Sequence, residues 1–228
     1  MDWWPWLFYL LGNWYFWPIY GAILYGIASP FIRRFRTWQA KTRFIRSQGA
    51  KLQNPQNADA RFQLANIYAE GGSWRKALEY ATDAVRVARE NPLFEGQAPY
   101  HLLRLLGDVQ YRRGNDAEAI DAYEQALKAK SDLGHGDARF GLGRSLLRKG
   151  DAAKAFDVIN QSLEDNGSNL EGYFRLAQAA VALGRDKECD QVKREFWRVS
   201  KLLPAFAGKS RLRWRIAFIL FPITRGLL

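Results

Sequence analysis

Residue types that commonly carry chemistry are few in this sequence, and their spacing forms no catalytic or metal-binding set. The two histidines, His101 and His135, lie far apart, which is not the spacing of a metal-binding pair. A single cysteine, Cys189, excludes an internal disulfide and a cysteine-rich metal site. The sequence contains no glycine-rich phosphate loop of the P-loop or dinucleotide-binding type. We therefore predict that the protein is not an enzyme and has no catalytic residues, cofactor or metal.

Four segments of the chain share one residue pattern, and this pattern predicts the elements that position the other side chains. In each segment a Leu precedes a small residue, and a glycine follows seven positions later. These glycines are Gly72, Gly114, Gly150 and Gly184. Apolar residues at helical spacing on both sides of the glycine predict two amphipathic helices, the first of which ends at the glycine. One such pair cannot bury its apolar face alone, so we expect neighbouring pairs to stack.

This pattern resembles the tetratricopeptide repeat (TPR) family, and the resemblance covers roughly residues 58–200. The second segment is nearly complete, with Leu106, Gly107, Tyr111, Gly114, Ala119, Tyr123 and Ala126. The spacing between segments is irregular, because an inserted loop occupies residues 91–99. The resemblance implies an all-α fold, in which a right-handed TPR-like solenoid of about four helix pairs has a concave groove lined by the first helix of each pair.

The residues that the resemblance places on the groove face include both aromatic side chains and arginines. Arginine can hold a carboxylate through two parallel hydrogen bonds, so such a surface suits peptide binding. The alternative is that the phenylalanines belong partly to the core and that the charges form a solvated face. The predicted partner-binding residues are Phe62, Asn66, Arg104, Asp108, Tyr111, Arg112, Phe140, Arg144, Arg148, Phe174 and Gln178.

The N-terminal residues 3–32 read as a transmembrane helix. They are longer than the roughly 20 apolar residues that cross a bilayer, and tryptophan favours the membrane interface. A cleaved signal peptide is the alternative, but here the positive charge follows the apolar run. By the positive-inside rule, we expect a single-pass inner-membrane protein with its N-terminus outside and its TPR domain in the cytoplasm. The predicted membrane anchors are Trp3, Trp4, Trp6, Trp14, Trp17, Trp38 and Trp214.

The net charge of +11 belongs to the flanks of the repeats, since residues 51–190 are close to neutral. Nucleic-acid-binding domains usually carry positive charge on the folded domain, so we expect no nucleic-acid partner. Positive charge beside a membrane helix favours anionic lipids instead. The predicted head-group contacts are Arg33, Arg34, Arg36, Arg211, Arg213 and Arg215.

The C-terminal residues 205–228 combine basic residues with an apolar run too short to span a bilayer. Three interpretations remain open. The segment is a basic interfacial tail in the head-group region, a docking helix for a partner membrane protein, or a helix that packs on the last pair of the solenoid.

The predicted order of parts is a transmembrane helix at 1–32, a basic juxtamembrane linker or helix at 33–57, the TPR solenoid at 58–204 and the tail at 205–228. This order favours a non-enzymatic, membrane-anchored scaffold, an accessory or assembly subunit of an inner-membrane protein complex. The alternative is a regulatory adaptor that presents a soluble enzyme or protease to membrane substrates. That arrangement is similar to the bacterial lipopolysaccharide-assembly adaptors, which end in a Cys-rich metal module that this chain lacks.

Overall fold

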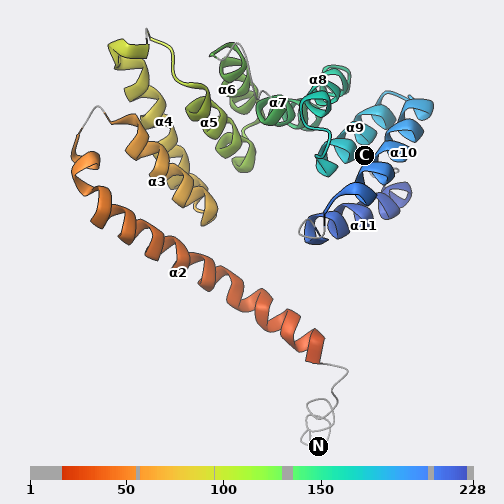
Figure 1. Ribbon diagram of the computed structural model, residues 1–228, viewed down its shortest axis with the longest axis horizontal. Helices are drawn as coiled ribbons and strands as arrows, with labels where there is room; N and C mark the ends of the chain where they lie inside the picture. Colours follow the sequence, from red (N-terminus) through yellow and green to blue (C-terminus); the bar gives the residue numbers. More distant parts are fainter. Residues whose placement is uncertain (1–16, 55–56, 95, 130–135, 205–207, 225–228) are drawn as a thin grey trace, which may run out of the picture.

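The computed structural model describes residues 17–54, 57–94, 96–129, 136–204 and 208–224, and within these ranges the regular structure is helical (Figure 1). Four antiparallel pairs follow one another along an arch. The pairs are α3 (Ala58–Glu70) with α4 (Trp74–Glu90), α5 (Tyr100–Arg113) with α6 (Asp116–Ala129), α7 (Gly136–Lys149) with α8 (Ala152–Asp165), and α9 (Leu170–Ala182) with α10 (Asp186–Leu202). A short 3-10 helix, η2 (Pro92–Phe94), lies in the inserted loop. The predicted all-α solenoid of four helix pairs is confirmed.

The turn inside each pair has the geometry that the glycine spacing predicts. Gly114 has a φ of 88°, and its N–H donates to carbonyl oxygens of the last turn of α5. Gly72, Gly150 and Gly184 also have positive φ. Residues with a Cβ rarely adopt this left-handed conformation, so the glycine ends the first helix and sends the chain back along it.

Close packing between pairs depends on Tyr123 of α6. Its ring is fully buried, and it occupies the space that a side chain at Gly107 or Gly141 would need. A Cβ at Gly141 would lie 2.4 Å from the Tyr123 ring. Tyr123 therefore joins α5 and α7 through one aromatic ring, and the two glycines are small because the ring is there.

Helix α2 (Trp17–Gln53) precedes the solenoid and runs without interruption through positions 32 and 33 (Figure 1). Near its C-terminal end, Phe44 is buried against Ala60 and Leu64 of α3. The larger part of α2 extends away from the solenoid. Among the helices that the structure describes, none is both long and apolar enough to cross a membrane. Residues 3–16 of the predicted span lie outside the described ranges.

Helix α11 (Gly208–Thr224) follows the fourth pair and packs on α9 and α10. Its Trp214 and Phe218 belong to the same buried cluster as Leu176 of α9 and Phe196 of α10. The hydrophobic core therefore continues from the solenoid into α11, which covers the apolar end that a last repeat would otherwise expose.

Candidate partner-binding groove

The first helices of the pairs contact one another, α3 with α5, α5 with α7 and α7 with α9, and so line one face of the arch. A groove of about 700 Å³ lies on this face between α5, α7 and α9. Its lining includes Tyr111, Arg144, Arg148, Arg175 and Gln178. Aliphatic side chains of α7 and α9, Leu147 and Val181 among them, complete it.

Asp108 of α5 is the acceptor that holds one wall of the groove in place. Its carboxylate accepts a hydrogen bond from the Tyr123 hydroxyl at 2.6 Å. It also accepts from Arg104 at 3.1 Å and from Arg144 at 3.2 Å. One carboxylate therefore connects α5, α6 and α7, and it fixes the position of the Arg144 side chain, which is only 12% exposed.

The ring of Tyr111 lies beneath two guanidinium groups from α7. The guanidinium carbon of Arg144 is 4.1 Å from the ring centroid, and that of Arg148 is 3.9 Å away. Arg148 also donates to both carboxylate oxygens of Asp116, each at 2.7 Å, and to the Tyr111 carbonyl at 2.7 Å. Cation–π contacts and ion pairs together order these long side chains before any ligand arrives.

The opposite wall belongs to α9. Arg175 donates to the Gln178 side-chain oxygen at 3.0 Å and pairs with Glu171 at 3.5 Å. A guanidinium group carries five N–H donors, so an arginine that is held by one carboxylate keeps donors for a second acceptor. The groove thus offers cationic donors from two helices around an aromatic floor.

The protonation of the central network follows from its burial. Burial raises the pKa of the Tyr123 hydroxyl well above its ordinary value, and the Asp108 carboxylate raises it further. Burial alone lowers the pKa of Arg144, but Tyr123 and Asp108 outweigh burial and raise it. At neutral pH the phenol is therefore a neutral donor and the guanidinium is charged.

The predicted groove residues separate into two sets. Tyr111, Arg144, Arg148 and Gln178 line the groove together. Asp108 and Phe140 contact the Arg144 guanidinium, and Arg104 pairs with Asp108. The others lie elsewhere. Phe62 packs edge-on against His101 at 4.9 Å, Asn66 lies on α3, and Arg112 lies over the Trp74 ring at 5.9 Å.

Phe174 and Trp214 differ most from their expected roles. The sequence predicts Phe174 in the groove and Trp214 at the membrane, but their rings contact each other with centroids 5.5 Å apart. Trp214 is only 8% exposed. The physical reason is that α11 has a second apolar face, and this aromatic face is buried against the end of the solenoid. Of the three interpretations of the tail, the structure therefore shows packing on the last helix pair for this face of α11.

The repeat mapping missed Arg175, the third arginine of the groove. At the equivalent repeat positions the other segments have Gln63, Leu105 and Gly141. No regularity of the pattern therefore points to a cation at this position, and only the tertiary arrangement reveals it. Within the described ranges, no three His, Cys, Asp or Glu side chains gather closely enough to hold a metal ion.

The residues expected at the membrane are only partly within the described structure. Trp3, Trp4, Trp6 and Trp14 lie outside it, and for Trp17 and Arg33 only the helical backbone is described. Trp38 is exposed and stacks on Phe35 at 5.9 Å, and Arg34 and Arg36 are exposed beside it. Arg211 and Arg215 bind groups of α10 and its C-terminal end, whereas Arg213 is exposed.

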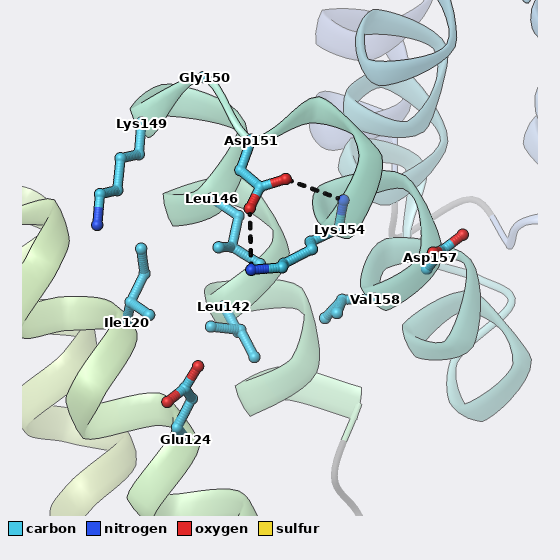
Figure 2. A pocket seen from close by; sticks show the side chains of 10 residues that line it. All are labelled: Ile120, Glu124, Leu142, Leu146, Lys149, Gly150, Asp151, Lys154, Asp157 and Val158. Carbon is cyan, nitrogen blue, oxygen red and sulfur yellow. Dashed lines mark hydrogen bonds and ion pairs between the residues drawn. The ribbon is translucent and has the colours of Figure 1, made fainter. Parts of the chain in front are cut away.

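A second hollow, of about 780 Å³, lies between α6, α7 and α8 (Figure 2). Leu142 and Leu146 lie at its base, and charges of both signs surround it. Asp151 there is already paired with Lys154, through the backbone N–H at 3.2 Å and the ammonium group at 3.4 Å. Three acidic and two basic side chains line this hollow, and Asp151 and Lys154 neutralise each other, so no single charge dominates and the groove is the stronger candidate.

Comparison with known proteins agrees with this architecture. A family model described as tetratricopeptide repeat matches residues 93–133 and 104–171. A TPR repeat-containing protein of Methanocaldococcus jannaschii is 28% identical over 114 residues, which is 50% of this chain and 18% of that protein. The chain thus spans under a fifth of that relative's length.

Solved structures show the same fold. MamA has a TM-score of 0.59 at 17% identity, covering 69% of this chain and 85% of its own. YrrB, described as a TPR protein with an unusual peptide-binding site, has a TM-score of 0.54 at 20% identity over 69% and 73%. PilW, a type IV pilus biogenesis factor, has a TM-score of 0.62 at 18% identity over 81% and 79%. The family match and these solved structures together support a tetratricopeptide repeat fold for the solenoid of this chain.

Proposed function

We propose that the protein is a non-enzymatic, membrane-anchored TPR scaffold that binds a protein segment in the groove between α5, α7 and α9. The observation that carries this proposal is the ordered group of Arg144, Arg148 and Arg175 around Tyr111. Such a surface fits an extended segment with carboxylate side chains, because each guanidinium can take a carboxylate in addition to its own partner. Protein binding by a groove of this fold has a parallel in the peptide-binding site named for YrrB.

Membrane attachment through residues 3–32 is part of the proposal, with the solenoid in the cytoplasm at the inner membrane. The support comes from the long apolar run followed by arginines and from the exposed aromatic side chains of α2. Phe31, Phe35 and Trp38 are spaced four and three residues apart, so they share one face of the helix, and all are exposed. We assign the protein as an accessory or assembly subunit of an inner-membrane complex.

Affinity purification of the tagged full-length chain from native membranes in mild detergent tests both parts. We expect a stoichiometric membrane protein complex that is lost from the variant carrying both Phe140→Ala and Arg144→Ala. It should be retained by the matched variant Arg86→Ala, an exposed arginine on the outer helix α4. Replacing residues 3–32 with a plain Leu/Ala helix should also abolish the association if these residues contact the complex.

Other results would contradict the proposal. Recovery of soluble proteins only, unaffected by the helix replacement, would make the protein an adaptor with a simple membrane tether. Recovery of the same complex by the double groove variant would show that the groove does not bind the partner. A chain extracted from membranes by salt alone would exclude the anchor.

A further inference from the structure

Helix α11 has two apolar faces, and only one of them is covered. The inner face carries Trp214 and Phe218, which are buried against α9 and α10. The outer face carries aliphatic residues at positions i, i+4, i+7 and i+8, so they form one stripe along the helix. The stripe consists of Leu212, Ile216, Ile219 and Leu220, with exposed fractions of 61, 48, 62 and 47%.

Contacts of the inner face fix the direction in which this outer stripe points. The Phe218 ring stacks on Phe196 with centroids 3.9 Å apart and meets Phe174 edge-on at 5.3 Å. Arg211 donates to the Leu203 carbonyl at 3.1 Å, and Arg215 donates to the Ser200 hydroxyl at 2.6 Å. Rotating α11 to bury the stripe would expose two large aromatic side chains and break these bonds, so the stripe stays outward.

The charge beside the stripe has one sign. Helix α11 contains no Asp or Glu, and its basic residues include Arg213 and Arg215 on the two flanks of the stripe. A helix with an aliphatic centre and cationic flanks matches a bilayer surface, where hydrocarbon accepts the aliphatic side chains and anionic head groups accept the arginines. With 17 residues and several arginines in its first half, α11 is suited to lie along a membrane surface and is too short in apolar length to span it.

We propose that the outer stripe of α11 inserts into the head-group region of an anionic membrane and holds the C-terminal end of the solenoid against the bilayer. The inference rests on the proposed membrane anchor, which brings α11 beside a lipid surface. It assigns the lipid contact to Leu212, Ile216, Ile219 and Leu220, while Trp214 stays in the protein core. Both ends of the solenoid are then tied to one membrane.

A single-cysteine fluorescence experiment on the full-length chain tests this assignment. Cys189→Ala removes the native thiol and is compatible with packing, since the equivalent residues of the other pairs are alanines. Ile219→Cys then carries an environment-sensitive NBD label. The matched control is Leu93→Cys in η2, an aliphatic residue that is 84% exposed and belongs to the other end of the solenoid.

The labelled proteins are reconstituted into vesicles of phosphatidylcholine with or without phosphatidylglycerol. We expect blue-shifted emission and quenching by spin-labelled lipid at Ile219, several-fold stronger than at Leu93, in the anionic vesicles. Adding Arg213→Gln should lower the partition of α11 into the anionic surface about fivefold, since one basic residue near such a surface contributes about that factor. Circular dichroism checks that each variant remains folded.

The outcomes separate the inference from the proposed function. Flotation of the same vesicles in a density gradient measures whether the chain is attached to the membrane. A chain that floats while its Ile219 label behaves like the Leu93 label overturns the α11 contact alone. A chain that does not float overturns both. A response at Ile219 that occurs only in native membranes, and not in vesicles of purified lipid, assigns the stripe to a protein partner and overturns the lipid contact.

Discussion

Phe140 and Phe174 occupy the same repeat position, three residues before the small residue of their helices, yet their surroundings differ. Phe140 lies in the middle of the arch, beneath the Arg144 guanidinium at 5.4 Å. Phe174 lies near the end of the arch, beneath the aromatic rings of Trp214 and Phe218. A charged side chain leaves the middle open to a ligand, whereas an aromatic helix closes the end. The repeat supplies a phenylalanine at this position three times, counting Phe62 of the first pair, and in these two cases the neighbouring element decides whether the ring borders an open groove or a closed core.

The largest expected effect comes from uncovering the closed end. Phe218→Ala should lower the local free energy of unfolding of α9 to α11 by about 3–5 kcal/mol, because it removes a buried ring between two other phenylalanines. Hydrogen exchange of the full-length chain in mild detergent measures this. Ile219→Ala, one position along and facing outward, should change protection by less than about 0.5 kcal/mol. Equal effects would show that α11 does not close the core.

The next largest expected effect is the difference in unfolding free energy between the two phenylalanine variants. Phe174→Ala should lower the free energy of unfolding by about 2–4 kcal/mol, because its ring packs between α9 and α11. Phe140→Ala should lower it by about 1 kcal/mol, because the Phe140 ring is partly open. Urea unfolding of the two variants under identical conditions gives both values. A Phe140→Ala variant as unstable as Phe174→Ala would mean that the middle of the arch is closed as well.

Arg144 tests whether the middle region is held by charge. Arg144→Ala should destabilise the protein by about 1–3 kcal/mol, because a largely buried guanidinium is lost from Asp108 and from the Tyr111 ring. Arg139→Ala on the same helix, which breaks only the partly exposed pair with Asp165, should cost less than about 1 kcal/mol. Thermal unfolding of the two variants measures both losses of stability. The prediction fails if Arg139→Ala destabilises the protein more than Arg144→Ala does.

The smallest effect is a pH dependence to which Tyr123 of the middle region contributes, beside Tyr80 and Tyr173 whose pKa values burial also raises. The pKa of Tyr123 is raised in the folded state, so above pH 10 the unfolded chain loses this proton first and stability falls. Tyr123→Phe should remove part of this alkaline loss while costing about 1 kcal/mol at neutral pH, from the hydrogen bond to Asp108. Unfolding midpoints between neutral pH and pH 11 check the sign. An unchanged alkaline slope in Tyr123→Phe would contradict the assignment.

Local pattern predicted most of the fold, since helix periodicity and turn glycines are properties of short segments. The four pairs and their left-handed turn residues follow from positions such as Gly114, whose role depends only on its neighbours in sequence. Tyr111, Arg144, Arg148 and Gln178 could be placed in the groove because each occupies a repeat position that faces the groove on the first helix of its pair, whatever residue type the other pairs hold there.

Contacts between distant segments could not be predicted in the same way. Arg175 enters the groove at a repeat position that holds Gly141 in the preceding pair. The burial of Trp214 depends on α11 folding back onto Phe174, 40 positions earlier in the chain. The four exposed aliphatic residues of α11 could be separated from its buried aromatic residues only once one face was known to be covered.

Because α2 is one continuous helix, it sets the orientation of the groove relative to the N-terminal segment. A helix of 37 residues is about 55 Å long and turns by about 100° at each residue. Because Phe44 fixes α2 to α3, the rotation of the earlier part of α2 about the helix axis is fixed relative to the solenoid. Inserting a single alanine between Ile32 and Phe44 would rotate the groove by about 100° relative to the N-terminal segment, and inserting seven would nearly restore it. The number of residues in α2 therefore sets an angle as well as a length.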